Sequence, residues 1–282
     1  MSALFAETNA YLGVNAYASQ WQMGFASGKP INFAGSQYAT NRATPLIFMA
    51  GMSFSLVHNK IWAVTYQAEI GTASAAINYS SAEVSAEFKA TPSILRTDHS
   101  LALTRALGAS GFSLYAGAKL QYYGYREPGG SFTNTGMSQQ ATYNENKRLM
   151  NFGPALGLTY MFRVALRSYI ALQAGWIYFF GKYDDDISLV FLGNSVGVSQ
   201  AEKYQGLGGS ALVSFVSPLT DRLLLQIALR GQYYITRSTE AQLTNITATG
   251  KRQVTDISGS ALMDNVQDLL FGAQIAAIYR LF

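Results

Sequence analysis

The sequence is poor in the residues on which many enzyme and metal sites depend. It contains no cysteine, which excludes a disulfide framework, a thiolate zinc site and a cysteine nucleophile. Histidine occurs twice, at His58 and His99. Charged residues make up 13% of the chain, whereas a soluble domain usually has about 25%. The net charge is +4 and the basic residues are scattered, so we expect no nucleic-acid partner.

Long apolar runs are missing as well. No stretch of about 18 apolar residues occurs, which excludes a transmembrane helix. The chain is nevertheless 49% hydrophobic and contains 26 glycines, 18 tyrosines and 16 phenylalanines. This composition is typical of a membrane β-barrel, in which alternation along each strand dilutes the lipid-facing signal. The N-terminus has no basic segment and no long apolar segment, so we expect a mature chain whose export signal has been removed.

Residues 222–236 show the alternation most clearly. Large apolar side chains and one glycine occupy one parity: Leu223, Leu225, Ile227, Leu229, Gly231, Tyr233 and Ile235. Polar side chains occupy much of the other: Arg222, Gln226, Arg230, Gln232 and Thr236. A period of two places these sets on opposite faces of a β-strand. Since the pattern recurs about ten times with almost no helical segment to cover it, we expect the apolar faces to meet lipid and the polar faces to line a barrel.

The pattern predicts a single domain, residues 1–282, folded as an antiparallel up-and-down β-barrel of about ten strands, with twelve as the alternative. The ten expected strands are 9–22, 45–57, 61–72, 94–107, 112–126, 149–163, 168–183, 206–217, 222–236 and 266–282. Short turns alternate with long loops, which we place at 23–44, 73–93, 127–148, 184–205 and 237–265. Outer-membrane barrels have short periplasmic turns and long extracellular loops. Residues 1–8 form an N-terminal segment that lies in the periplasm or in the lumen.

Two residues fit this scheme poorly. Pro154 lies in the middle of a strand on the lipid-facing parity and cannot donate to the strand ladder, so we expect a bulge or irregularity there. Arg105 lies on an apolar parity near the periplasmic end, where its side chain can extend towards water. A soluble β-sandwich is disfavoured, because outward Trp, Phe and Leu on nearly every strand would make it insoluble.

The C-terminal residues 269–282, LLFGAQIAAIYRLF, resemble the last strand of bacterial outer-membrane proteins, which typically ends on an aromatic residue after alternating apolar positions. The resemblance implies the outer membrane as location, outer-membrane lipid and lipopolysaccharide as surroundings, and the assembly machinery as a partner that reads this strand. The chain departs from the family pattern because its apolar parity ends at Leu281, which leaves Phe282 one residue off the usual register.

Residues on the polar parity are the candidates for function. As pore-lining candidates we take Glu69, Arg96, Asp98, Lys119, Gln121, Tyr123, Arg163, Gln173, Arg222, Gln226, Arg230, Asp268 and Arg280. Basic residues outnumber acidic ones in this set, which favours anions in a narrow pore. The opposing interpretation is that these charges pair and close the lumen, since a barrel of about eight strands is just filled by its side chains. An intermediate case is a narrow channel gated by inward Tyr residues and by residues 1–8.

Catalytic and metal sites receive little support. His99 and Ser100 evoke the His-x-Ser motif of outer-membrane lipid hydrolases, but adjacent residues point to opposite faces of a strand, so base and nucleophile cannot meet. The run Asp184-Asp185-Asp186 does not match the spacing of an EF-hand loop, and we interpret it as a solvated loop. We therefore expect no enzyme activity, no metal and no cofactor.

The sequence favours a narrow passive channel for small solutes with a mild anion preference. The alternatives are a closed barrel whose loops serve in adhesion or in an envelope complex, and an outer-membrane lipid or peptide hydrolase.

Overall fold

The computed structural model describes residues 7–22, 31–33, 36–42, 45–74, 77–81, 86–90, 93–134, 137–191, 194–246, 251–256, 261 and 263–282. These residues form a closed antiparallel barrel of ten strands. The barrel strands are β1 (Thr8–Gln22), β4 (Leu46–His58), β5 (Trp62–Ser74), β8 (Ser93–Ala106), β9 (Phe112–Asn134), β10 (Met137–Arg163), β11 (Tyr169–Phe191), β12 (Asn194–Pro218), β13 (Leu223–Ile246) and β15 (Gln267–Arg280). In the described part of the chain, no helix has the length and apolar character needed to cross a membrane.

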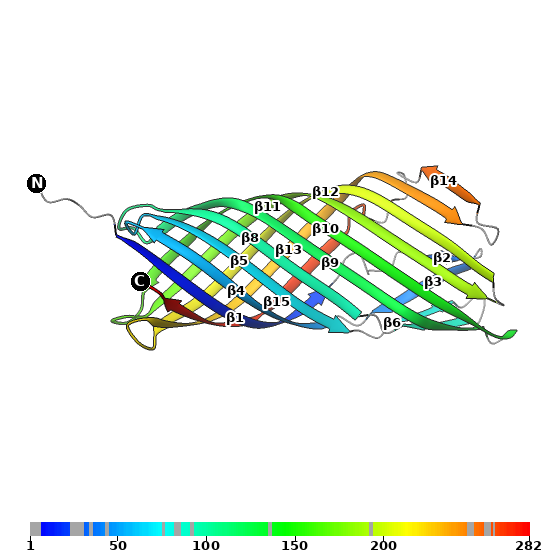
Figure 1. Cartoon of the computed structure of the whole chain (residues 1–282), viewed down its shortest axis with the longest axis horizontal. Coiled ribbons are helices and arrows are strands. Elements are labelled where there is room, and N and C mark those ends of the chain that lie inside the picture. The colour runs from blue at the N-terminus through cyan, green and yellow to red at the C-terminus, as the bar shows by residue number, and fades with distance from the viewer. Residues whose placement is uncertain are drawn as a thin grey trace, which may run out of the picture.

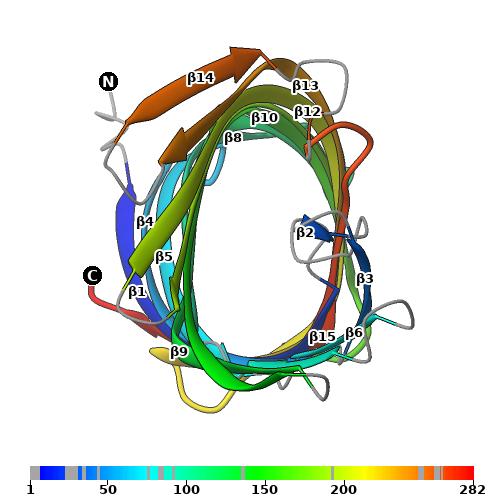
Figure 2. The ribbon, with the colours of Figure 1, turned by 90° about the vertical axis from the view of Figure 1, so that its right-hand side faces the viewer.

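The strands follow one another around the ring in chain order, and the first strand pairs with the last (Figures 1 and 2). In that closing pair the register runs from Tyr11 opposite Arg280 to Gln22 opposite Leu269. Both ends of the barrel sequence therefore lie at the end that carries the short turns (Figure 1). The prediction of ten strands is confirmed, and the alternative of twelve is excluded for the barrel itself.

The two faces of the strands differ as the alternation predicts. Outward apolar side chains form a band of exposed surface, with Phe48 63% and Trp176 56% exposed. Such a continuous apolar surface needs lipid around it. Near the short turns, the Arg105 guanidinium lies 5.2 Å from the centre of the Trp62 ring, which holds this outward arginine at the periplasmic edge of the band.

The strands β9 to β13 continue well beyond this band. At its extracellular edge the outward residues change from Met150 and Phe180 to charged residues, among them Arg148, Lys182 and Asp184. The expected loops 127–148 and 184–205 were wrong, because β9 pairs with β10 as far as Asn134 and β11 pairs with β12 as far as Phe191. In the same way β13 runs on to Ile246, inside the expected loop 237–265.

Shorter strands continue the wall on the opposite side of the barrel. They are β2 (Ile31–Phe33), β3 (Ser36–Arg42), β6 (Ile77–Ser81) and β7 (Ala86–Ala90), and β14 (Arg252–Asp256) pairs with the outer part of β13. Pairing runs from β2 through β3, β6 and β7 to β9. The expected loops 23–44 and 73–93 thus also contain strand, and these short strands lie at the end of the barrel opposite the two termini (Figure 1).

The predicted irregularity at Pro154 takes a milder form than a bulge. Pairing between β10 and β11 stops after Phe152 opposite Phe180 and resumes at Ala155 opposite Ile177. The register is the same on both sides of this gap, so no extra residue is inserted. Pro154 itself remains paired with Ala118 on the β9 side. The missing N–H of proline accounts for the local loss of pairing.

Candidate functional site

The barrel lumen changes character along its axis. Inward side chains near the periplasmic end, such as Ser55, Thr65 and Thr104, are half-exposed. Inward side chains farther up, such as Ile47 and Ile94, are 0% and 1% exposed. Because they belong to the same strands, the difference reflects what fills the lumen: space in its periplasmic half, and packed side chains in its extracellular half.

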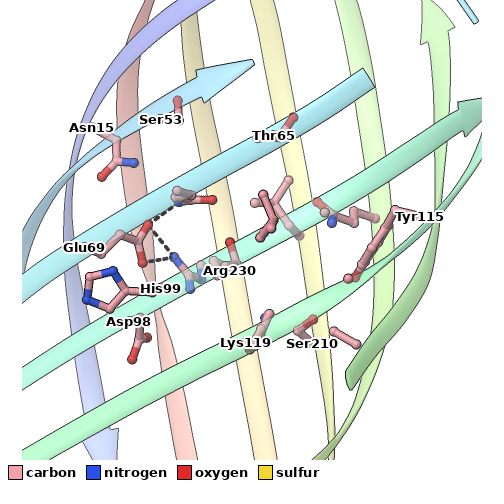
Figure 3. Close-up of a pocket in the computed structure, with 18 of the residues that line it drawn as sticks. Asn15, Ser53, Thr65, Glu69, Asp98, His99, Tyr115, Lys119, Ser210 and Arg230 are labelled. Carbon is pink, nitrogen blue, oxygen red and sulfur yellow. Dashed lines mark hydrogen bonds and ion pairs between the residues drawn. The ribbon is translucent and has the colours of Figure 1, made fainter. Parts of the chain in front are cut away.

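Ion pairs and hydrogen bonds cross the lumen where these two halves meet. The Arg230 guanidinium on β13 donates to both Glu69 carboxylate oxygens on β5, at 2.9 and 2.8 Å (Figure 3). On β8, Arg96 donates to Asp98 at 2.8 to 3.1 Å and reaches the Gln232 side-chain oxygen on β13 at 3.2 Å. The strand order β8-β9-β10-β11-β12-β13 places β8 and β13, the two strands that the Arg96–Gln232 contact joins, on opposite sides of the barrel. Side chains therefore span the lumen at this level.

An aromatic layer lies directly above these ion pairs. The rings of Trp21 and Tyr123 are 5.2 Å apart, and the Arg96 guanidinium lies 5.1 and 4.9 Å from their centres. The Trp21 indole N–H donates to Asp268 at 2.7 Å. A cation held against two aromatic faces in a buried site is a stable contact, worth about 2 kcal/mol or more when desolvated. We call Trp21, Arg96 and Tyr123 the closing layer.

Further aromatic side chains fill the opposite side of the lumen at the same height. Phe179 on β11 packs edge-on against Tyr204 on β12 and Tyr234 on β13, with ring centres 6.2 and 5.6 Å apart. Gln121 on β9 donates to the Tyr234 hydroxyl at 3.0 Å, which links the two sides. The described side chains thus close the extracellular half of the lumen.

Below the closing layer lies a cavity of about 390 Å³. Its wall is rich in neutral polar groups, among them Asn15, Ser53, Thr65 and Ser210 (Figure 3). Gln173 also lines it. Four charged side chains, those of Glu69, Asp98, Lys119 and Arg230, also line it. Since its lower lining residues are half-exposed, the cavity opens towards the periplasmic end of the barrel.

Lys119 differs from the other charges of the cavity. Glu69 and Arg230 pair with each other, and Asp98 pairs with Arg96. Within the described part of the chain, Lys119 makes no hydrogen bond and no ion pair. Its ammonium is therefore the uncompensated charge on the cavity wall.

The structure divides the predicted pore-lining residues into three groups. Glu69, Asp98, Lys119, Gln121, Gln173, Gln226 and Arg230 line the cavity. Arg96, Tyr123 and Asp268 belong to the closing layer or contact it. Arg163, Arg222 and Arg280 lie exposed at the periplasmic rim, where Arg163 donates to carbonyls of the adjacent turn and Arg280 lies 3.8 Å from Glu7.

Sequence reasoning missed most of the inward aromatic residues. Trp21, Phe179, Tyr204 and Tyr234 are all at most 4% exposed inside the barrel. A usable signal was present, because Trp21 shares its parity with the inward Asn15 and Tyr17. The same signal was present for Phe179, which shares its parity with the inward Gln173 and lies between the outward Tyr178 and Phe180.

The two histidines differ in position, because His99 borders the cavity and His58 does not (Figure 3). His58 is the last residue of β4, next to a periplasmic turn, and its Nδ1 lies 3.1 Å from the Thr8 hydroxyl. His99 is on the outward parity of β8, with Nδ1 at 3.0 Å from the Tyr66 hydroxyl, whereas Ser100 is on the inward parity. In the residues that the structure describes, no group of three His, Asp or Glu side chains could hold a metal ion.

A charged cluster fills the barrel above the membrane. The Lys147 ammonium lies 2.9 Å from the Glu145 carboxylate and 3.9 Å from that of Asp185. Asp185 was expected in a solvated loop, but it points inward from β11 and is 3% exposed, and the Tyr183 hydroxyl donates to it at 2.9 Å. Burial raises the pKa of Asp185 from its ordinary 3.8 to about 7, with Glu145 adding to the rise and Lys147 opposing it.

This raised pKa predicts a pH-dependent stability of the extracellular wall. The folded protein holds the Asp185 proton to higher pH than the unfolded chain does, so stability falls as pH rises from about 4 to about 7 and is constant above that. We expect backbone amides of β10 and β11, corrected for intrinsic exchange, to exchange at least about fivefold more slowly at pH 5 than at pH 8. Asp185→Asn should abolish the difference, and a difference that persists in this variant would contradict the assignment.

Comparisons with known proteins bear on the fold. No protein-family model and no curated protein sequence matches the chain. Among solved structures, it is similar to the outer membrane protease OmpT from Escherichia coli, with a TM-score of 0.57, 10% identity and 99% of both chains covered. It is also similar to the translocator domain of the autotransporter NalP from Neisseria meningitidis, with a TM-score of 0.40, 14% identity and coverage of 99% of this chain and 90% of that one. At these identities the likeness shows the fold alone.

Proposed function

We propose that this protein, a bacterial outer-membrane β-barrel, is a narrow, gated channel for small polar solutes that is closed at rest. The observation that carries the proposal is the polar cavity of about 390 Å³, which occupies the periplasmic half of the lumen and ends at side chains. A barrel with only a structural role has no need of a hydrated half-lumen.

The closing contacts are of a kind that can switch. Side-chain rotations take picoseconds to nanoseconds on a surface and longer in packed sites, whereas strand rearrangement requires breaking the backbone ladder. Arg230–Glu69 and Arg96–Asp98 are side-chain pairs that can each re-form with other partners along a polar wall. Gating by side-chain constrictions and charged rings is a general device of pores. Ten strands are few for a wide pore, so we expect a small conductance.

The charges of the lumen support a mild anion preference. The carboxylates of the cavity are each paired with an arginine, while Lys119 remains uncompensated. An unpaired positive charge in a narrow space with low-dielectric walls raises the local concentration of anions.

The test is single-channel recording from the full chain refolded into planar bilayers. We expect wild type to show brief, infrequent openings with a reversal potential that favours anions. Arg230→Gln removes the cross-lumen pair with Glu69 and leaves that carboxylate uncompensated, so it should raise the open probability several-fold and shift selectivity towards cations.

Lys203→Gln is the matched control, because it also removes one partner of an ion pair, here with Glu240 at 2.8 Å on the outside of the extracellular wall. It should behave as wild type. If wild type and Arg230→Gln both form heat-resistant barrels but stay silent, the channel proposal fails.

A second candidate function rests on the length of β9 to β13. Their hairpins carry charged side chains outward above the membrane, such as Arg148 paired with Asp186 at 3.2 Å. A wall of this kind can serve as a docking surface for a partner or for another cell, with the barrel as its anchor. Shortening the β11–β12 hairpin between the paired residues Ile187 and Val198 should abolish the binding of cells that carry this protein to their partner or to other cells, while the barrel still folds. Unchanged binding would exclude this hairpin as the docking surface.

A further inference from the structure

We propose that the periplasm-facing cavity is a binding site for a small anion that also carries hydroxyl groups, with Lys119 as the residue that binds the acid group. Binding of this kind does not require the closing layer to open. It therefore goes beyond the channel proposal and can hold where that proposal fails.

The charge arrangement around the cavity calls for an anion. Both Glu69 oxygens accept from Arg230, and both Asp98 oxygens accept from Arg96. These carboxylates are thus already engaged by guanidinium groups. The Lys119 ammonium has three donors and no protein acceptor in the described part of the chain. A carboxylate or phosphate would supply the charge-assisted hydrogen bonds that it lacks.

The neutral wall of the cavity indicates the rest of the ligand. Side-chain amides of Asn15, Gln67, Gln173 and Gln226 surround the space together with hydroxyls of Ser53 and Thr65. Amides both donate and accept, as do the hydroxyl groups of a sugar or a hydroxy acid. No tryptophan or phenylalanine is among the described residues that line the cavity, and its aromatic residue Tyr115 carries a polar hydroxyl group. The buried rings of Trp21 and Phe179 are not part of this wall.

The size and access of the cavity limit the ligand further. Its volume of about 390 Å³ lies near the lower end of the ~300–1,000 Å³ found for small-molecule sites. This is enough for a monosaccharide with one acid group. Because the closing layer blocks the extracellular side, the ligand arrives from the periplasm. The chemical class is therefore a sugar acid or a sugar phosphate that is present in the periplasm.

A purely structural role for Lys119 is the competing explanation. In that case its charge offsets the carboxylates of the lumen through space, and no ligand is required. Both explanations predict that removing the Lys119 charge destabilises the fold, but only the binding explanation predicts that added anions bind at the cavity. A binding measurement, rather than stability, separates them.

The experiment is isothermal titration of the full chain in lipid nanodiscs with gluconate, glucose 6-phosphate and glucose. We expect both anions to bind and glucose to bind at least about tenfold more weakly. The anion with the higher affinity identifies carboxylate or phosphate as the acid group. Lys119→Gln should weaken anion binding at least about tenfold, and Lys119→Arg should keep it within a few-fold. Lys182→Gln, which removes an exposed lysine outside the barrel, should bind as wild type.

A second readout covers the case in which Lys119→Gln does not fold. Lysines of the wild-type protein are labelled by ¹³C reductive methylation, and the Lys119 resonance is assigned as the one missing in Lys119→Arg. We expect this resonance to shift when gluconate or glucose 6-phosphate is added and to stay in place with glucose. No shift with either anion, equal binding of glucose, or full anion binding by Lys119→Gln would overturn the proposal. Silent bilayer recordings alone would leave it standing.

Discussion

Removing both rings of the closing layer, in the double variant Trp21→Ala/Tyr123→Ala, is expected to convert brief openings into steady conductance. The two rings lie 5.2 Å apart on β1 and β9 and close the lumen between them. Arg96 loses both aromatic faces in this variant and can turn towards the cavity. We expect the mean current per barrel to rise at least about tenfold, measured in planar bilayers under a salt gradient.

The backbone should tolerate this change. Truncating a buried aromatic side chain costs about 3–5 kcal/mol in a protein core, but here the space left behind adjoins the polar cavity below, which reduces the cavity cost. The ladder hydrogen bonds of β1 with β4 and β15 are not touched. Trp176→Ala is the matched control, because Trp176 is outward and 56% exposed to lipid. This control also removes a tryptophan ring, but from the outer face, so it should leave the conductance unchanged.

A silent but folded double variant would place the closure elsewhere. Phe179, Tyr204 and Tyr234 fill the other side of the lumen at the same height. Phe179→Ala on the double-variant background would then test whether this second group is sufficient to hold the lumen shut. If this triple variant is also silent, the lumen does not conduct and the long extracellular wall becomes the better candidate for function.

The strands inside the membrane were predictable because lipid and lumen impose opposite chemistry on the two faces. In β13 the sequence places Leu225, Ile227 and Leu229 outward and Gln226 and Arg230 inward, as the structure does. Above the membrane both faces meet water, so the contrast between neighbouring residues disappears. The sequence pattern therefore predicted a loop at residues 184–186. In the structure Asp185 lies inside the barrel, whereas Asp184 pairs on the outside with Lys182 and Asp186 with Arg148.

The candidate site was predictable as a set of residues but not as a set of contacts. Parity placed Glu69, Arg96, Asp98 and Arg230 inside the barrel. The Glu69–Arg230 pair joins residues 161 positions apart, and no local pattern specifies which strands face each other across a ring. The parity of a residue also could not distinguish the lumen from the rim. Arg222, which lies in an exposed turn, was therefore grouped with Arg230.

Gly153→Ala is expected to abolish most folding of the barrel. A Cβ on Gly153 would overlap the Tyr178 carbonyl oxygen and lie 2.6 Å from the Phe179 Cα atom. Both obstacles are backbone atoms of β11, so no side-chain rotation can relieve them. At this point β10 already lacks pairing with β11 at Gly153 and Pro154, and further separation of the two strands would open the ring.

We expect the folded, heat-resistant band of Gly153→Ala on unboiled SDS gels to fall to less than about a tenth of wild type, because overpacking against fixed neighbours is strongly destabilising. Gly209→Ala is the matched control: this glycine faces lipid from β12, and the nearest atom to an added Cβ is the Gly175 carbonyl oxygen at 3.7 Å. It should fold as wild type. Equal folding of both variants would mean that the close approach of β10 to β11 does not constrain barrel closure. The gap in pairing at Pro154 would then be caused by the missing N–H of the proline alone.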